Sequence, residues 1–308
     1  MSAPNATAWS ALENKSFRPF WAAGVLMSSG MVIQDVSASW LMTTLTSSPG
    51  LIAAIQTVQS LPILLLAIPA GALADVLDRR RWMIALLLLQ FALALTLGTL
   101  AFGAALTPLS LLLLLFFVGC LFALFNPAWM RTVPDVLSGP EIPKGVTLNS
   151  MAVNLSRLIG GTLAALLLAT FFPGAGFWVN GLLLIAPLAV LQRWNAPPPN
   201  AALPPEAVSD AIASGLRYAQ HSPLVRTVLL RTTCFVIFAC AVPTLLPVVA
   251  KQILHLDALG FGLLTASFGA GALFGATIAG PLRRFVSQEN LMTAATLILA
   301  PVSYTHLT

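Results

Sequence analysis

Residues 79–104 read RRRWMIALLLLQFALALTLGTLAFGA, a basic triplet followed by an uncharged and mostly apolar run. A helix needs about 20 apolar residues to cross the hydrocarbon core of a bilayer, so this stretch predicts a membrane-spanning helix that begins directly after a basic loop. Comparable runs occur along the rest of the chain. We expect spans at residues 17–44, 50–72, 82–104, 107–127, 146–170 and 175–191, and further spans near 224–250, near 258–280 and from residue 291 onward.

The composition agrees with a chain that is solvated by lipid. Hydrophobic residues make up 58% of the 308 residues and charged residues only 8%, whereas a typical soluble domain has roughly 25% charged residues. The first apolar run is too long for a signal peptide, and other spans follow it. We therefore expect an all-α polytopic membrane protein with about nine spans.

Lys and Arg residues lie almost entirely on one side of the predicted spans. Of the 15 such residues, Lys251 alone falls in a loop of the opposite side, and Arg157 falls within a span. Because short loops rich in Lys and Arg stay in the cytoplasm, we expect a bacterial inner-membrane protein with a cytoplasmic N-terminus. The same distribution argues against nucleic-acid binding, since the basic residues are spread over several loops rather than gathered in one patch.

A polar stretch divides the predicted spans into two groups. Residues 192–222 begin Pro-rich and continue as a predicted amphipathic helix at 206–220 that would lie along the cytoplasmic interface. We expect an N-terminal six-helix bundle at 1–191, a cytoplasmic linker at 192–222 and a partial C-terminal bundle at 223–308. The chain stops inside its ninth predicted span, and residues 303–308 turn polar, so we expect a truncated or artificial C-terminus.

The loop between the second and third spans carries the most specific motif, GALADVLDRRR at residues 71–81. It resembles the cytoplasmic loop signature of the major facilitator superfamily, Gly-x-x-x-Asp-(Arg/Lys)-x-Gly-Arg-(Arg/Lys)-(Arg/Lys). The matching residues are Gly71, Asp75, Arg79, Arg80 and Arg81, whereas Val76 and Asp78 depart from the signature. The resemblance implies two six-helix bundles that this loop latches together at the cytoplasmic side. The alternative is that three arginines merely anchor the loop in the cytoplasm.

The resemblance extends over nearly the whole chain. Residues 126–136 and 149–160 look like the branch that includes the enterobactin exporter and related secretion permeases. The antiporter-like signature of that branch is incomplete here, which supports transport more strongly than antiport. Small residues in predicted spans favour close helix packing. The glycines that we expect at helix contacts are Gly160, Gly161, Gly271 and Gly275.

Two charged residues fall inside predicted spans, each near a polar neighbour. Asp35 follows Gln34 in the first span, and Arg157 lies near Asn154 in the fifth. A charge at this depth costs at least about 2.5–3.5 kcal/mol unless it is paired or faces water, so we expect these four residues around a cavity for protons and substrate. Asp35 would exchange protons, or it would face an outer vestibule without coupling. Arg157 would bind an anion, or it would serve as a structural hydrogen-bond donor.

These observations predict a secondary active transporter that exports a small hydrophobic or amphipathic molecule (siderophore, drug or metabolite) in exchange for protons by alternating access. We expect it to act as a monomer in the lipid bilayer, without a cofactor, a metal or a nucleic-acid partner. The chain shows no P-loop, nucleophile elbow or zinc-ligand cluster, so we do not expect an enzyme. A non-functional fragment and a membrane-embedded enzyme remain the alternatives.

Overall fold

The computed structural model describes residues 8–194, 220–223, 225–227, 230, 240–282, 286–287, 290 and 293–294. Every regular element within these residues is a helix, so the prediction of an all-α chain is confirmed for the described part. The predicted amphipathic helix of the linker, apart from Gln220, and most of the ninth predicted span lie outside it.

The helices coincide with the apolar runs of the sequence to within a few residues. The long helices of the first part are α1 (Phe17–Leu45), α2 (Pro49–Val76), α3 (Arg79–Phe102), α4 (Pro108–Met130) and α6 (Ile142–Thr170). The sixth apolar run forms two consecutive helices, α7 (Ala175–Leu183) and α8 (Ile185–Arg193). Further along the chain lie α11 (Ala241–Val248), which continues as a π-helical turn (Val249–Ile253), and α12 (Ala258–Leu282). Short elements at the loops are η1 (Ala8–Glu13), α5 (Thr132–Val136) and η2 (Gly139–Glu141).

Six helical segments of the described part are long and apolar enough to cross a membrane. Four of them contain α3, α4, α6 and the pair α7–α8, and the other two are the first parts of α2 (Pro49–Ala67) and α12 (Ala258–Gly275). Helix α1 has 29 residues but is not among them, because Gln34 and Asp35 lower its hydropathy. The total number of spans and the division into two bundles stay predictions.

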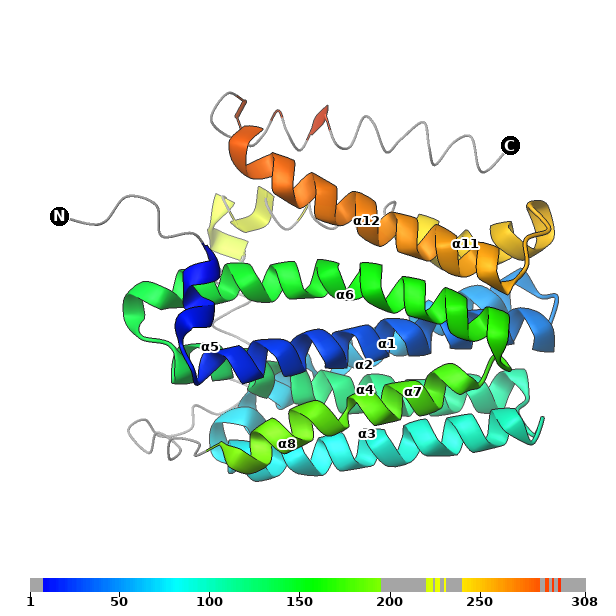
Figure 1. Cartoon of the computed structure of the whole chain (residues 1–308), viewed down its shortest axis with the longest axis horizontal. Helices are drawn as coiled ribbons and strands as arrows, with labels where there is room; N and C mark the ends of the chain where they lie inside the picture. The colour runs from blue at the N-terminus through cyan, green and yellow to red at the C-terminus, as the bar shows by residue number, and fades with distance from the viewer. Residues whose placement is uncertain are drawn as a thin grey trace.

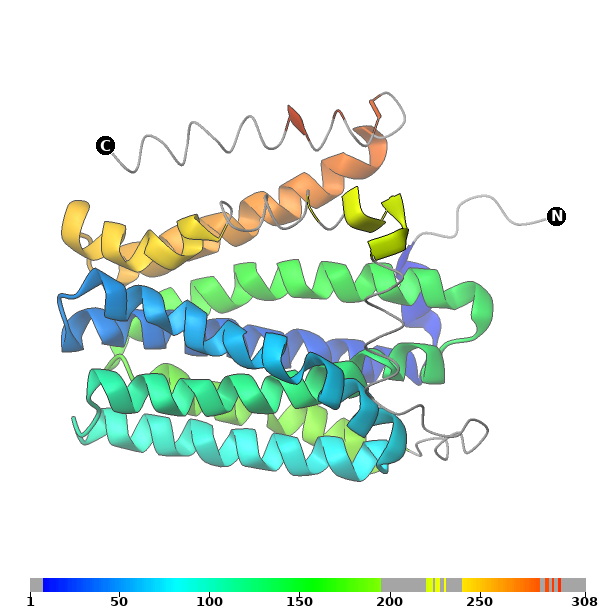
Figure 2. The same cartoon turned by 180° about the vertical axis from the view of Figure 1, so that it is seen from behind.

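The long helices lie roughly side by side, so their loops gather at two ends of the molecule (Figures 1 and 2). We call one of them the basic end, because its basic residues include Lys15, Arg18, Arg79, Arg80, Arg81, Arg131, Lys144 and Arg193. The other, the opposite end, holds the loops at 46–48, 103–107, 171–174 and 254–257. The basic end lies on the left in Figure 1.

Helix α1 occupies the centre of the assembly. It packs against α6, α7 and α8, while α2 packs on α4, and α3 on both α4 and α7. Helix α12 lies over α6, on the side away from α3 (Figure 1), and α11 packs against α2. Large apolar side chains such as Leu64, Leu109 and Phe274 are 77%, 72% and 68% exposed. Their exposure fits a surface that lipid covers, because a water-soluble protein rarely leaves so many contiguous apolar groups uncovered.

Candidate functional site

Helix α6 connects the first group of helices to α12 through a pair of glycines. A Cβ atom at Gly160 would lie 2.7 Å from the backbone oxygen of Ser29 in α1. A Cβ atom at Gly161 would lie 2.9 Å from the backbone nitrogen of Ala266 in α12. Both distances are too short for any side chain, so α6 approaches α1 with one face and α12 with the other, as small residues allow.

The glycines that α12 contributes to this contact differ from the expected pair. A Cβ atom added at Gly262 would lie 2.4 Å from Ala165, and one added at Gly269 would lie 2.7 Å from the Leu158 nitrogen. At Gly271 and Gly275, by contrast, no atom of the described residues lies within 4 Å of such a Cβ atom. The packing predicted at Gly271 and Gly275 is therefore not seen in the described part.

A cavity of about 640 Å³ lies among α1, α2, α6, α11 and α12. Most of its lining is apolar and comes from Val, Leu, Pro and Phe side chains. Its charged and uncharged polar side chains are Asp35, Ser39, Gln56, Arg157, Thr265 and Ser267. This combination of an apolar wall with a few polar groups is typical of a small-molecule site.

Asp35 and Arg157 line this one cavity from two helices that run in the same direction. Ser156 donates a hydrogen bond to the Val25 backbone oxygen at 2.9 Å, which fixes the register of α6 on α1. Arg157 is therefore level with about residue 26, roughly two and a half turns before Asp35. At 1.5 Å per residue the backbone positions of the two residues are about 13 Å apart along the helix axis, and no ion pair joins their side chains in the described residues.

The other two predicted cavity residues lie elsewhere. Gln34 is buried between α1 and α7, where its Oε1 accepts a hydrogen bond from Asn180 Nδ2 at 2.7 Å. Asn154 donates from Nδ2 to the Ser150 backbone oxygen of its own helix at 3.2 Å. Neither lines the cavity. The cavity also has polar groups from α2 and α12. Sequence reasoning missed them because the register of these two helices on α1 cannot be read from the sequence.

Helix α1 meets the later helices at the opposite end through aromatic and polar contacts. The Lys251 Nζ lies 4.7 Å from the centroid of the Trp40 ring, and Trp40 stacks on Phe261 with ring centroids 5.7 Å apart. Gln252 Nε2 donates a hydrogen bond to the Ser47 backbone oxygen at 3.1 Å. Because Phe261 is also part of the cavity wall, we interpret these contacts as the cover of the cavity at the opposite end.

The basic loop makes its described contacts at the basic end of the first helices. Arg79 forms an ion pair with Asp135 of α5. Arg80 donates to the Leu191 backbone oxygen at 2.8 Å and also to that of Gln192. Asp78, which stands where the signature has glycine, caps α3 by accepting a 3.1 Å hydrogen bond from the Arg81 backbone nitrogen.

The remaining signature positions are less informative. A Cβ atom at Gly71 would meet nothing within 4 Å, and the side chain of Asp75 lies outside the described part. Asp135, the partner of Arg79, lies within residues 126–136, which were considered above only for their resemblance to a branch of transporters. The sequence offered one sign of this ion pair, an acidic residue in a basic loop region, but the two partners are 56 positions apart in the chain.

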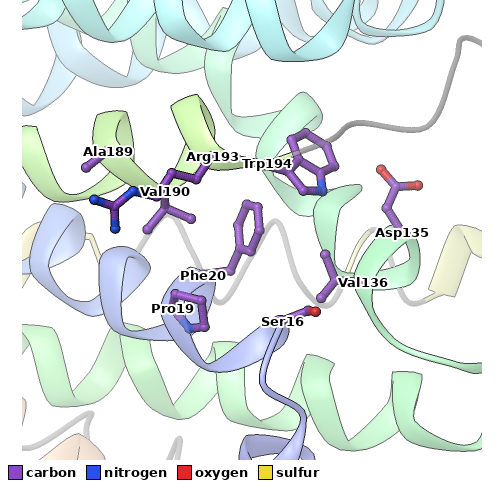
Figure 3. A pocket seen from close by; sticks show the side chains of 9 residues that line it. All are labelled: Ser16, Pro19, Phe20, Asp135, Val136, Ala189, Val190, Arg193 and Trp194. Carbon is purple, nitrogen blue, oxygen red and sulfur yellow. The ribbon is translucent and has the colours of Figure 1, made fainter.

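A second pocket, of about 560 Å³, opens at the basic end beside this ion pair. Asp135 and Arg193 line it, together with Phe20 and Trp194 (Figure 3). The two rings meet edge to face with centroids 5.4 Å apart. Because Asp135 already pairs with Arg79, this pocket belongs to the packing around the loop rather than to the central cavity.

Comparison with known proteins relates this architecture to membrane transporters. The sequence model of the transmembrane secretion effector family matches residues 6–307. The chain is similar to the uncharacterized MFS-type transporter YfiS of Bacillus subtilis, with 28% identity over 255 residues, 78% of this chain and 57% of the relative.

Two further relatives carry functional names. The staphyloferrin A transporter of Staphylococcus aureus is 22% identical over 279 residues, 88% of this chain and 68% of the relative. The multidrug efflux pump Tap of Mycolicibacterium fortuitum is 27% identical over 289 residues, 90% of this chain and 69% of the relative. The chain thus spans 57% of the length of the first relative and about two thirds of the other two.

Proposed function

The chain belongs to the transmembrane secretion effector family, and on this premise we propose that it is a secondary active transporter that exports a small hydrophobic or amphipathic molecule. Its family and its apolar helices make it a multi-pass protein of the bacterial plasma membrane. Relatives named as a staphyloferrin A transporter and a multidrug efflux pump support a siderophore, drug or metabolite as the exported molecule.

The observation that carries this proposal is the central cavity with its cover at the opposite end. The cavity wall combines α1, α2 and α6 with α11 and α12, so a substrate bound there touches helices from both sides of the linker. With the N-terminus in the cytoplasm, the covered end faces outward, and substrate enters from the cytoplasmic side. Release requires the contacts of Lys251 and Gln252 to break, which is the alternating-access cycle of a transporter.

Asp35 is the proton-exchanging group in this cycle. It lines the cavity. An acidic side chain inside a span is costly and is retained mainly where it serves transport or a proton relay. Proton binding at Asp35 from outside and proton release inside then drive the conformational cycle in the direction of export.

The basic loop acts at the cytoplasmic side and favours one of the two arrangements of the helices. Its described contacts reach only α5 and the end of α8 with its adjoining residue. We propose that the loop is the cytoplasmic latch that its motif implies. We place Gly71, Asp75 and the three arginines in this latch, and we expect the whole transporter to work as a monomer.

The test is proton-driven flux through the purified chain. Proteoliposomes with an acidic lumen are mixed with the amphipathic dye Hoechst 33342, and dye accumulation is followed by fluorescence. We expect accumulation by the wild type and a fall to the level of empty liposomes for Asp35→Asn, since the amide binds no proton at neutral pH. Glu13→Gln is the matched control because Glu13 is exposed and distant from the cavity.

The outcomes separate two claims. Undiminished gradient-driven accumulation by Asp35→Asn would remove Asp35 from the coupling mechanism while leaving transport intact. Absence of gradient-driven accumulation by the wild type, in liposomes shown to contain folded protein, would contradict proton-coupled export by this chain.

A further inference from the structure

Two opposite charges line the central cavity without neutralising each other. Asp35 and Arg157 both belong to its wall, and within the described residues neither forms an ion pair. Both residues are exposed, so a ligand that displaces water from the cavity must offer each charge a polar or charged partner in return. A cavity that holds both charges unpaired is therefore most complementary to a ligand that brings both counter-charges.

The charges occupy different depths of the cavity. Helix α12 runs opposite to α6, with Gly269 beside the backbone of Arg157 and Gly262 beside Ala165. The backbone of Arg157 consequently lies toward the basic end, and that of Asp35 lies about 13 Å closer to the covered end at 1.5 Å per residue. A ligand that satisfies both must carry its cation and its anion at separate ends of the molecule.

Two of the neutral polar groups, Thr265 and Ser267 of α12, lie between these two depths. Thr265 donates its hydroxyl proton to the Phe261 backbone oxygen at 3.1 Å, and Ser267 donates to that of Leu263 at 2.8 Å. Their protons are occupied, but each hydroxyl oxygen keeps acceptor capacity. The apolar remainder of the wall, including Phe261 and Phe268, suits a flat or aliphatic body between the charged ends.

We propose that the cavity recognises drug-sized zwitterionic amphipaths, with a cationic amine at Asp35 and a carboxylate at Arg157. This inference rests on the proposed function, because it names the substrate class of the same cavity. The volume of about 640 Å³ falls in the range of roughly 300–1,000 Å³ that holds such ligands. Molecules that lack one of the two charges leave one side chain of the cavity without its partner.

The test compares three fluorescent probes that share one scaffold. Norfloxacin is a zwitterion at neutral pH, its ethyl ester is a cation, and its N-acetyl derivative is an anion. Binding is titrated on the full chain in lipid nanodiscs. We expect the wild type to bind norfloxacin at least about tenfold more tightly than either derivative, corresponding to about 1.4 kcal/mol.

Variants assign each charge to its side chain. Arg157→Gln should lower norfloxacin affinity to that of the ethyl ester without changing the affinity for the ester itself. Asp35→Asn should do the same relative to the N-acetyl derivative, and Arg157→Lys should keep part of the carboxylate preference. Arg18→Gln and Glu13→Gln, which alter exposed charges outside the cavity, should leave all three affinities unchanged.

Equal binding of the three probes by the wild type would overturn the inference, as would absence of binding by all three. A preference that persists in both Arg157→Gln and Asp35→Asn would overturn it as well. Gradient-driven Hoechst accumulation is measured on the same preparations. Accumulation without a preference for the zwitterion would leave the proposed function standing while this inference fails, whereas loss of accumulation with the preference intact would contradict transport alone.

Discussion

Three adjacent arginines show how differently neighbouring residues of one basic loop are used. The Arg79 and Asp135 side chains are only 21% and 19% exposed in their ion pair, whereas Arg81, which pairs with Asp78, is 88% exposed. Arg80 donates instead to backbone oxygens at the end of α8 and just beyond it. A largely covered ion pair is screened less by solvent than an exposed one, whereas an exposed ion pair contributes little to the stability of the fold.

Arg79→Gln should lower the free energy of unfolding by about 1–3 kcal/mol, because it leaves the largely covered Asp135 carboxylate without its charged partner. Arg81→Gln is the matched control and should change stability by less than about 0.5 kcal/mol. Both are measured by unfolding the detergent-solubilised chain with increasing sodium dodecyl sulfate. Equal losses for the two variants would show that Arg79 acts only as one more basic charge of the loop.

Single residues also mark a limit of sequence reasoning. Gln34 and Asp35 are neighbours in the chain, and both were expected at the cavity. Successive residues of a helix point about 100° apart, so one of them faces Asn180 of α7 and the other faces the cavity. The sequence shows that a polar pair lies inside a span, but it does not show which neighbouring helix covers which side.

Helix α12 illustrates the same limit for a whole element. Its apolar length was readable from composition, and the helix lies where the apolar run predicts it. Its small residues, however, occur on several faces, so the sequence alone favoured Gly271 and Gly275. The face that meets α6 carries Gly262, Ala266 and Gly269, at spacings of four and three residues that place them on one side of a helix.

Substitution of these glycines tests the contact between α6 and α12. Gly269→Val would place a Cβ atom 2.7 Å from the Leu158 nitrogen, and backbone cannot move aside as a flexible side chain does. We expect a loss of about 1–3 kcal/mol in the free energy of unfolding and a weaker affinity for norfloxacin, since Arg157 lies at this contact. Gly271→Val brings the same change in helix propensity but has no described neighbour within 4 Å.

The two variants are compared in the same unfolding titration. A loss for Gly271→Val as large as that for Gly269→Val would show that the contact face of α12 is assigned wrongly. A loss confined to Gly269→Val would support the register in which Arg157 lies beside this glycine.

At the scale of the whole molecule, the cavity and its cover belong to helices on both sides of the linker. The apolar runs and the distribution of basic loops predicted the helices and their alternation between two ends, because lipid imposes both length and charge asymmetry on spans. The contact of α11 and α12 with the first helices could not be predicted in this way. This contact depends on side chains such as Trp40 and Lys251, which meet in the fold although they are 211 positions apart in the chain.

A reversible cross-link across the covered end tests the central claim, export by alternating access, most directly. Cysteines replace Ser47 and Gln252, which are in hydrogen-bond contact, in a chain whose three native cysteines are changed to alanine. Hoechst accumulation is then measured in acidic-lumen proteoliposomes before oxidation, after oxidation and after reduction, with Ser47→Cys alone as the control. The account predicts that oxidation abolishes accumulation in the double variant only and that reduction restores it. Undiminished accumulation by the fully cross-linked chain would contradict the account.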